Sequence, residues 1–174
     1  MSSILTASGR LVDFLDPRPS DIFILDIAQA LSKESRFNGH TYGFYSVAQH
    51  SWLVSCNVPQ EFALEALLHD ATEAYMKDIP KPLKELLPEY QEIEDRLGRV
   101  IRSRFGLPTT PSPEVHRADM QALATEKRDL IKNHNAQWEC LRGVEAWEKR
   151  ISPMSPNHAM AVFISRFLEL NEIA

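Results

Sequence analysis

A histidine, an aspartate and a glutamate lie within one short segment, residues 67–73 with the sequence LLHDATE. The four-residue spacing of His69 and Glu73 predicts that both lie along one side of a helix that otherwise resembles core. A buried ionised carboxylate is costly unless it is paired or bound to metal. Two carboxylates beside a histidine therefore indicate a cation, and the segment favours a metal-dependent hydrolase.

The candidate metal ligands come from three predicted helices and are His50, His69, Asp70 and Asp119. Two imidazoles and two carboxylates suit a divalent ion such as Mn, Fe, Co or Zn, with Mg a further candidate. His40 is an alternative to His50, but it follows an Asn-Gly pair in a predicted loop. Each ligand taken alone also has a structural interpretation: His50 as a hydrogen-bonded core residue, and Asp119 as a salt-bridge partner.

The elements that position these residues are predicted to be helices at 23–35, 46–56, 60–75, 88–105, 113–131 and 138–148, with a last one that begins at Ser155-Pro156. Residues 1 to about 23 are expected to be irregular or weakly stranded. The two prolines in 78–82 predict a non-helical turn. The fold class that follows is all-α, a single domain over residues 1–174.

Composition narrows the classes of partner. The chain has 174 residues, 44% hydrophobic and 25% charged, and a net charge of -5, so it has no general attraction to nucleic acid or to anionic membranes. No apolar run approaches the roughly 20 residues that span a bilayer, and the N-terminus does not resemble a secretory signal. With only two cysteines, a reducing cytoplasm is expected. A homo-oligomer is also expected, since helix 88–105 could line a subunit contact, although a solvated face explains such a helix more often.

Five separated motifs together resemble the HD-domain metal-dependent phosphohydrolases, in the branch that hydrolyses deoxynucleotides. They are RF at 36–37, YSVAQHS at 45–51, HDATE at 69–73, DIPKPLK at 78–84 and RAD at 117–119. This branch includes bacterial 5'-deoxynucleotidases and small phage dATP triphosphohydrolases. The resemblance covers residues 24 to 170 and implies an HD-domain helical bundle whose ligands are the four residues above.

The resemblance also implies roles for other residues. Glu73 and Asp78 match acidic residues that orient and deprotonate the attacking water. Arg36 matches an arginine that holds phosphate, and Phe37 an aromatic residue that borders the nucleoside, where Gly39 leaves room in the base pocket. Lys84 occupies a basic position after the double-proline turn, and His116 is placed for a phosphate contact. The structural interpretations are a solvated residue for Arg36 and Lys84, a surface carboxylate for Glu73 and a turn anchor for Asp78.

The function expected from this resemblance is metal-dependent hydrolysis of a small nucleotide, removing triphosphate from dATP or a related dNTP. The alternatives are a 5'-deoxynucleotidase that acts on dNMPs, another HD-domain hydrolase of cyclic nucleotides or guanosine tetraphosphate, and an HD domain that binds a nucleotide without turnover. The number of basic groups that continue the phosphate path beyond Arg36 would distinguish the first two.

Overall fold

The computed structural model describes residues 2–132 and 135–172. Most of these residues are helical, as the sequence predicts. The helices are α1 (Ile24–Lys33), α2 (Val47–Cys56), α3 (Ala63–Leu68), α4 (Glu73–Met76), α5 (Lys81–Lys84), α6 (Pro88–Arg104), α7 (Pro113–Leu130) and α8 (Pro156–Glu172). Short 3₁₀ turns lie at Pro19–Asp21, Arg36–Gly39, Gln60–Phe62 and Glu139–Leu141.

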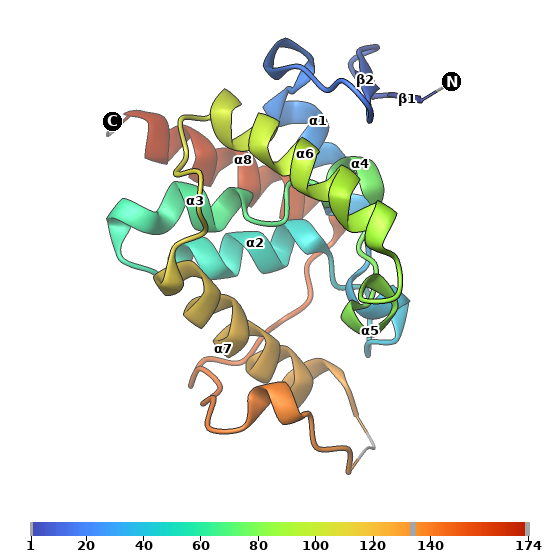
Figure 1. Cartoon of the computed structure of the whole chain (residues 1–174). Coiled ribbons are helices and arrows are strands. Elements are labelled where there is room, and N and C mark those ends of the chain that lie inside the picture. The colour runs from blue at the N-terminus through green and yellow to red at the C-terminus, as the bar shows by residue number, and fades with distance from the viewer. Residues whose placement is uncertain (1, 133–134, 173–174) are drawn as a thin grey trace.

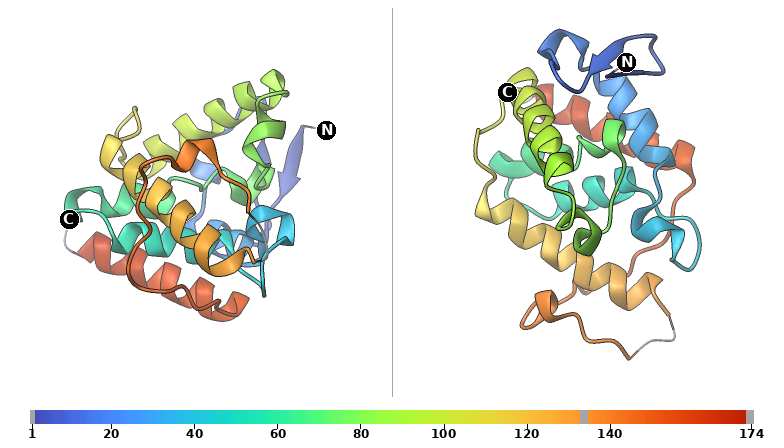
Figure 2. Two further views of the ribbon diagram at one scale, coloured as in Figure 1. Left: turned by 90° about the horizontal axis from the view of Figure 1, so that it is seen from below. Right: turned by 45° about the vertical axis from the view of Figure 1, so that its right-hand side comes forward.

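Helix α2 lies at the centre of the molecule, where it packs against α1, α3, α7 and α8 (Figures 1 and 2). Ser46 caps its N-terminus by accepting a hydrogen bond from the amide of Gln49 at 3.2 Å. Its first turn is fully enclosed, and the side chain of His50 is 0% exposed. The central helix therefore carries a polar ligand candidate directly into the core.

The main hydrophobic core joins α1, α3, α6 and α8 around α2, and includes Leu31, Leu67, Leu97 and Phe163. A second, smaller cluster of apolar residues joins α2 and α3 to α7. It consists of Val54, Ala66, Val115, Ala118 and Ala122. The second cluster fixes the face of α7 that points at α2, and that face also carries Asp119.

A small hairpin precedes the helices and qualifies the all-α prediction. Strands β1 (Ser3–Leu5) and β2 (Leu11–Asp13) pair antiparallel, with Ile4 opposite Val12. Val12 is fully buried and joins the main core. The weakly stranded segment expected at the N-terminus is thus a hairpin packed on the bundle.

In the view of Figure 1, helix α6 crosses the upper part of the molecule below the N-terminal hairpin, and α7 runs below α2. Both match the predicted helices to within a residue or two at each end. Gly106, with φ at +65°, follows α6 in the left-handed conformation, and the amide of Leu107 donates to the carbonyl of Arg102 at 2.9 Å. This glycine stop turns the chain from α6 toward α7.

Two predicted helices differ in the structure. Residues 60–75 do not form one helix: α3 ends at Leu68 and α4 begins at Glu73, with residues 69–72 in a tight turn. Its hydrogen bonds join residues three apart, as in Glu73 N–H to Asp70 carbonyl at 3.0 Å. Residues 138–148 are largely irregular, with one 3₁₀ turn at Glu139–Leu141. The predicted non-helical turn at 78–82 ends early, since Pro82 falls in the first turn of α5.

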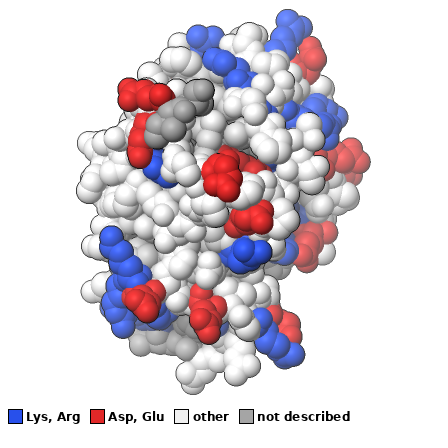
Figure 3. Space-filling model, turned by 90° about the vertical axis from the view of Figure 1, so that its left-hand side faces the viewer, with Lys and Arg blue, Asp and Glu red and all other residues white. Residues whose placement is uncertain are grey.

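The surface carries charges of both signs. On the face drawn in Figure 3, Lys and Arg side chains are interspersed with Asp and Glu, and no basic stripe of the kind that follows a nucleic-acid backbone crosses it. Among the helices in residues 2–132 and 135–172, none has the length and apolarity that crossing a membrane requires.

Candidate metal centre

Three predicted ligands converge between α2, the turn after α3, and α7. The Nε2 atoms of His50 and His69 are 3.2 Å apart, and Asp119 Oδ1 lies 3.2 Å from the first and 3.8 Å from the second. Ligand bonds of about 2.0–2.2 Å in tetrahedral geometry place neighbouring donor atoms roughly 3.4 Å apart. The three side chains therefore form a possible metal-binding triad with suitable spacing.

Asp70 lies beside this triad. Its Oδ2 atom is 3.4 Å from His50 Nε2 and 3.3 Å from His69 Nε2. Successive residues of a regular α-helix point about 100° apart. His69 keeps helical backbone angles, with φ at -63° and ψ at -35°, so both side chains reach the same point because this point lies at the edge of the turn, next to His50 of α2 and Asp119 of α7.

The second nitrogen of each imidazole is engaged in a way that fixes the tautomer. His50 Nδ1 lies 2.6 Å from Glu126 Oε1, and His69 Nδ1 lies 2.8 Å from the carbonyl oxygen of Ala66. Both partners are acceptors, so each Nδ1 carries the proton and donates it. In the neutral rings both Nε2 lone pairs then face each other and the carboxylate of Asp119, an arrangement that a cation between them would stabilise.

Glu126 of α7 is the partner of His50, and sequence reasoning missed it. The residue is fully buried, and its Oε1 also accepts a hydrogen bond from the hydroxyl of Tyr45 at 2.9 Å. Its Oε2 lies 3.3 Å from Nη2 of Arg36. Burial opposes the charged form, but Arg36 and His50 outweigh it and lower the pKa of Glu126 to about 2. An ionised carboxylate thus orients His50 toward the other ligands.

Formal charges give an independent test of whether a metal fits. Asp70, Asp119 and Glu126 carry three negative charges against one positive charge on Arg36, which contacts both Asp70 and Glu126 at 3.3 Å. With neutral imidazoles, one divalent cation would balance the cluster. Without it, burial and Arg36 lower the pKa of His50, yet Glu126 and Asp119 outweigh them and raise it to about 9. The donor set and its charge both fit a divalent ion.

Glu73 and Asp78 lie next to the cluster but outside the triad. The Oε2 atom of Glu73 is buried without a hydrogen-bond partner among the described residues. Burial first, and then Asp70 and Asp78, raise its pKa well above the ordinary value for a glutamate. Burial also raises the pKa of Asp78, against the opposing effect of Arg36. A carboxyl group whose pKa has moved toward neutrality is suited to proton transfer.

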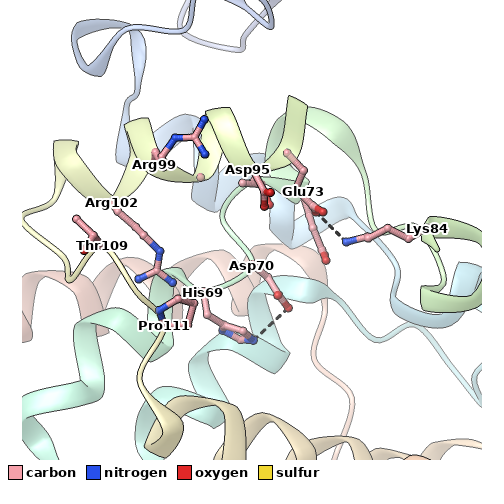
Figure 4. A pocket seen from close by; sticks show the side chains of 12 residues that line it. His69, Asp70, Glu73, Lys84, Asp95, Arg99, Arg102, Thr109 and Pro111 are labelled. Atoms are coloured by element: carbon pink, nitrogen blue, oxygen red, sulfur yellow. Dashed lines mark hydrogen bonds and ion pairs between the residues drawn. The ribbon is translucent and has the colours of Figure 1, made fainter. Parts of the chain in front are cut away.

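Two cavities adjoin the cluster, and Asp70, Glu73 and Lys84 line both of them. The first, which we call the aromatic cavity, measures about 820 Å³. It is lined by Arg36, Phe37, Asp70, Glu73, Asp78, Ile79, Pro80, Lys81, Pro82, Lys84, Glu85, Asp119, Leu123, Trp138 and Cys140. The second, the α6 cavity, measures about 360 Å³ and extends under α6 (Figure 4). Both volumes fall within the roughly 300–1,000 Å³ of small-molecule sites.

Three predicted substrate residues line these cavities. Phe37 lines the aromatic cavity, with its ring centroid 6.1 Å from that of Trp138. Arg36 lines the same cavity while it pairs with Asp70 and Glu126. Lys84 reaches both cavities, and its Nζ lies 2.7 Å from Glu94. Lys84 and Arg36 are therefore not merely solvated surface residues.

Other predicted residues lie elsewhere. Gly39 and His116 are exposed and line neither cavity. Gly39 has φ at +78° and follows Phe37 and Asn38, which also adopt left-handed conformations, so its place in the structure is to shape the loop. His40 is exposed in this loop, whereas His50 is in the cluster, so the structure favours His50 of the two alternatives.

Glu126 and Trp138 were not predicted as site residues, but the sequence contains a signal for Glu126. Glu126 follows Asp119 by seven residues on a predicted helix, so the two share a face, and the cost of a buried carboxylate applies to both. Trp138 had no such signal. It reaches the aromatic cavity from an irregular segment that was predicted to be helical.

The orienting role of Glu126 predicts the result of an isosteric substitution. Glu126→Gln keeps an acceptor for His50 but removes the charge, and it is expected to weaken metal binding about 10–100-fold, as loss of an outer-sphere partner usually does. Titration with Co²⁺, followed by visible absorption, measures this. Tyr45→Phe is the control, because it removes a hydrogen bond to the same carboxylate and leaves the charge. Equal affinity in Glu126→Gln and the wild type would contradict the role.

Comparisons with known proteins identify relatives of this chain. It is 49% identical over 174 residues to a protein of Escherichia coli (strain K12) named "Uncharacterized protein YfdR", and the match covers 99% of this chain and 98% of that protein. An uncharacterized protein of Rhodobacter capsulatus is 42% identical over 121 residues, which are 64% of this chain and 62% of that one. No protein-family model matches the chain.

Proposed function

This chain belongs to the family of YfdR, and we propose that it is an HD-domain phosphohydrolase that uses a divalent metal to hydrolyse deoxynucleotides. The substrate class that we propose is a deoxynucleoside triphosphate, with dATP as the first candidate. Water would attack the α-phosphorus and form a new P–O bond, while the bond from that phosphorus to O5' of the sugar breaks. The products are a deoxynucleoside and tripolyphosphate.

The observation that carries this proposal is the convergence of donor atoms from separate elements. The three donor atoms of His50, His69 and Asp119 lie within 3.8 Å of one another, and Asp70 Oδ2 is within 3.4 Å of both imidazoles. We propose all four as the ligands. The lone pairs directed at a common point and the excess of two negative charges both support a divalent ion rather than a structural hydrogen-bond network.

The ion's contribution is general. A divalent cation held by these residues supplies Lewis-acid stabilisation of charge on the phosphoryl oxygens and lowers the pKa of the attacking water. The chain itself would supply the proton acceptor. Glu73 has a buried, unpartnered carboxyl oxygen and a raised pKa, which are properties of a general base. In this proposal Asp78 assists it from the rim of the aromatic cavity.

The aromatic cavity is the proposed site of the nucleoside. Phe37 and Trp138 supply ring faces or edges, and Leu123 and Ile79 supply aliphatic surface. Planar bases pack favourably on such side chains, with about 1–3 kcal/mol for a base stacked on an aromatic ring. Arg36, at the border between this cavity and the ligands, is placed to contact the phosphate next to the sugar.

A product analysis tests the proposal. The protein is incubated with the four dNTPs, the matching rNTPs and the dNMPs, each with Mn²⁺, Co²⁺, Mg²⁺ or Zn²⁺, and the products are separated by anion-exchange chromatography. We expect deoxynucleosides and tripolyphosphate from dNTPs. Orthophosphate from dNMPs, with dNTPs unchanged, would instead identify a 5'-deoxynucleotidase. Metal-loaded protein that hydrolyses none of these nucleotides would overturn the proposal.

A further inference from the structure

The α6 cavity differs in chemistry from the aromatic cavity next to it. Its lining contains three cationic side chains, four carboxylates and two threonines, and Pro111 is its one apolar side chain among the described residues. The lining residues are His69, Asp70, Thr72, Glu73, Lys84, Glu94, Asp95, Gly98, Arg99, Arg102, Thr109 and Pro111. Figure 4 shows Arg102 extending from α6 toward His69, with Lys84 approaching from α5 on the other side. A ligand at the metal centre would therefore extend into a polar space that carries both cationic and acidic side chains.

Two of the three cationic side chains have N–H groups that no described residue accepts from. Arg99 is exposed and forms no hydrogen bond or ion pair with any residue in the described part of the chain. Arg102 is held by its Nη1 atom alone, which donates to the carbonyl of Pro108 at 2.9 Å and lies 3.3 Å from Glu65 Oε1. The other N–H groups of a guanidinium fixed in this way remain available for a ligand.

A glycine in the middle of α6 supports the same conclusion. Gly98 lines the cavity, although glycine in a helix interior costs about 1 kcal/mol relative to alanine. A Cβ atom at this position would meet nothing closer than the Cγ2 atom of Thr72 at 3.7 Å, which is an ordinary contact. Packing therefore does not require glycine here. The absent side chain instead keeps the space beneath α6 open.

We propose that the α6 cavity binds the polyphosphate chain of the substrate, with Arg99 and Arg102 as contacts to the β- and γ-phosphates. Guanidinium groups suit this role because their planar N–H donors match phosphate oxygens. In this proposal the polyphosphate enters the cavity with a bound Mg²⁺, and Glu94 and Asp95 contact that ion. Proteins commonly bind Mg²⁺ through one or two carboxylates together with substrate phosphates. The inference rests on the proposed function, and it assigns the nucleoside and the polyphosphate to separate cavities on either side of Asp70 and Glu73.

Binding of inorganic tripolyphosphate with MgCl₂, measured by isothermal titration calorimetry, tests the assignment without turnover. Arg99→Glu is expected to weaken tripolyphosphate binding by at least about tenfold, since a charge-assisted contact becomes repulsive. The control is Arg18→Glu, which makes the same charge change at an exposed arginine, 69% accessible, in the N-terminal segment. The control is expected to bind within about twofold of the wild type.

A steric variant gives a second readout that does not depend on charge. Gly98→Leu fills the α6 cavity and is expected to abolish tripolyphosphate binding, while the affinity for dAMP, which needs only the aromatic cavity and the metal centre, stays within about twofold. Circular dichroism and the Co²⁺ absorption spectrum verify the fold and the metal centre. If the leucine variant does not fold, Arg99→Glu decides the question.

The outcomes separate this inference from the proposed function. Wild-type protein that hydrolyses dNTPs, with unchanged tripolyphosphate binding in both variants or with none in the wild type, would overturn the cavity assignment and leave the proposed function intact. Tripolyphosphate binding that depends on Arg99, in a protein without nucleotide turnover, would support the assignment and refute the proposed function.

Discussion

Asp119→Asn is expected to remove bound metal and reduce nucleotide hydrolysis to background. The substitution conserves size and takes away the negative charge that lies 3.2 Å from His50 Nε2 and 3.8 Å from His69 Nε2. The two imidazoles and Asp119 direct their lone pairs at the same point, where the metal would lie. Loss of Asp119 should therefore lower the metal affinity by more than the roughly 10–100-fold that is typical of an outer-sphere partner. Elemental analysis of the purified protein and a Co²⁺ titration measure the effect directly.

A matched control is available on the same helix. Glu114→Gln also removes one negative charge from α7, in its first turn and away from the ligand cluster. It is expected to change the helix-terminal electrostatics by less than about 1 kcal/mol and to leave metal content unchanged. Stoichiometric metal and normal turnover in Asp119→Asn would show that Asp119 is not a ligand and would place the metal outside this cluster. Wild-type protein that takes up no metal would show that the cluster is a hydrogen-bond network and would remove the basis of the proposed function.

Glu73→Gln is expected to separate metal binding from catalysis. Glu73 lies outside the triad, so Co²⁺ affinity should remain within a few-fold of the wild type. The variant cannot accept a proton, and hydrolysis is expected to slow about 10²- to 10⁴-fold, the usual contribution of a general base. Single-turnover kinetics at saturating metal measure the rate. A control is Glu92→Gln, which changes an exposed carboxylate of α6.

Glu73→Gln is also expected to stabilise the metal-free protein, although it slows hydrolysis. The pKa of Glu73 is raised in the folded protein, chiefly by burial, so the folded state favours the protonated form, and stability is lost as the pH rises through that pKa. Glutamine resembles the protonated form. The metal-free variant should therefore melt at a higher temperature than the wild type at neutral pH, with a smaller difference near pH 4. A slow variant that is also less stable would indicate a structural role for Glu73 instead of a catalytic one.

The turn at residues 69–72 illustrates what spacing can and cannot predict. The sequence predicted correctly that His69 is next to the core and that His50 and Asp119 come from neighbouring helices. It did not predict that α3 would stop at Leu68, because residues 69–72 contain neither proline nor glycine. A regular helix would have pointed Asp70 about 100° from His69. Hydrogen bonds between residues three apart rotate the chain by about 120° per residue, so the tighter turn does not by itself bring the two side chains together. They meet because the common point lies at the edge of the turn, next to His50 and Asp119 of the neighbouring helices.

The segment that begins at Trp138 is a case in which local propensity predicted the wrong secondary structure, a helix over residues 138–148. Residues 138–148 have no Gly or Pro except Gly143, which made a helix plausible. In the structure the segment is tied to α7 instead: Arg128 Nη1 donates to the carbonyl of Trp147 at 2.6 Å, and the amide of Trp147 donates to Thr125 Oγ1 at 2.9 Å. These long-range bonds engage the amide and the carbonyl of Trp147 without a helix. They are made by side chains that no periodicity analysis pairs.

The sequence by itself determined a mostly helical chain and four side chains whose chemistry suits one cation, since helical periodicity and the cost of a buried charge are both local properties. Only the tertiary structure decided how these residues are supported. Glu126 contacts His50 across 76 positions of the chain, and the α6 cavity joins residues of α4, α5, α6 and the segment before α7. The physical reason is that hydrogen-bond partners and cavity walls depend on how helices pack. Side-chain packing between distant segments leaves no periodic signal in either segment alone.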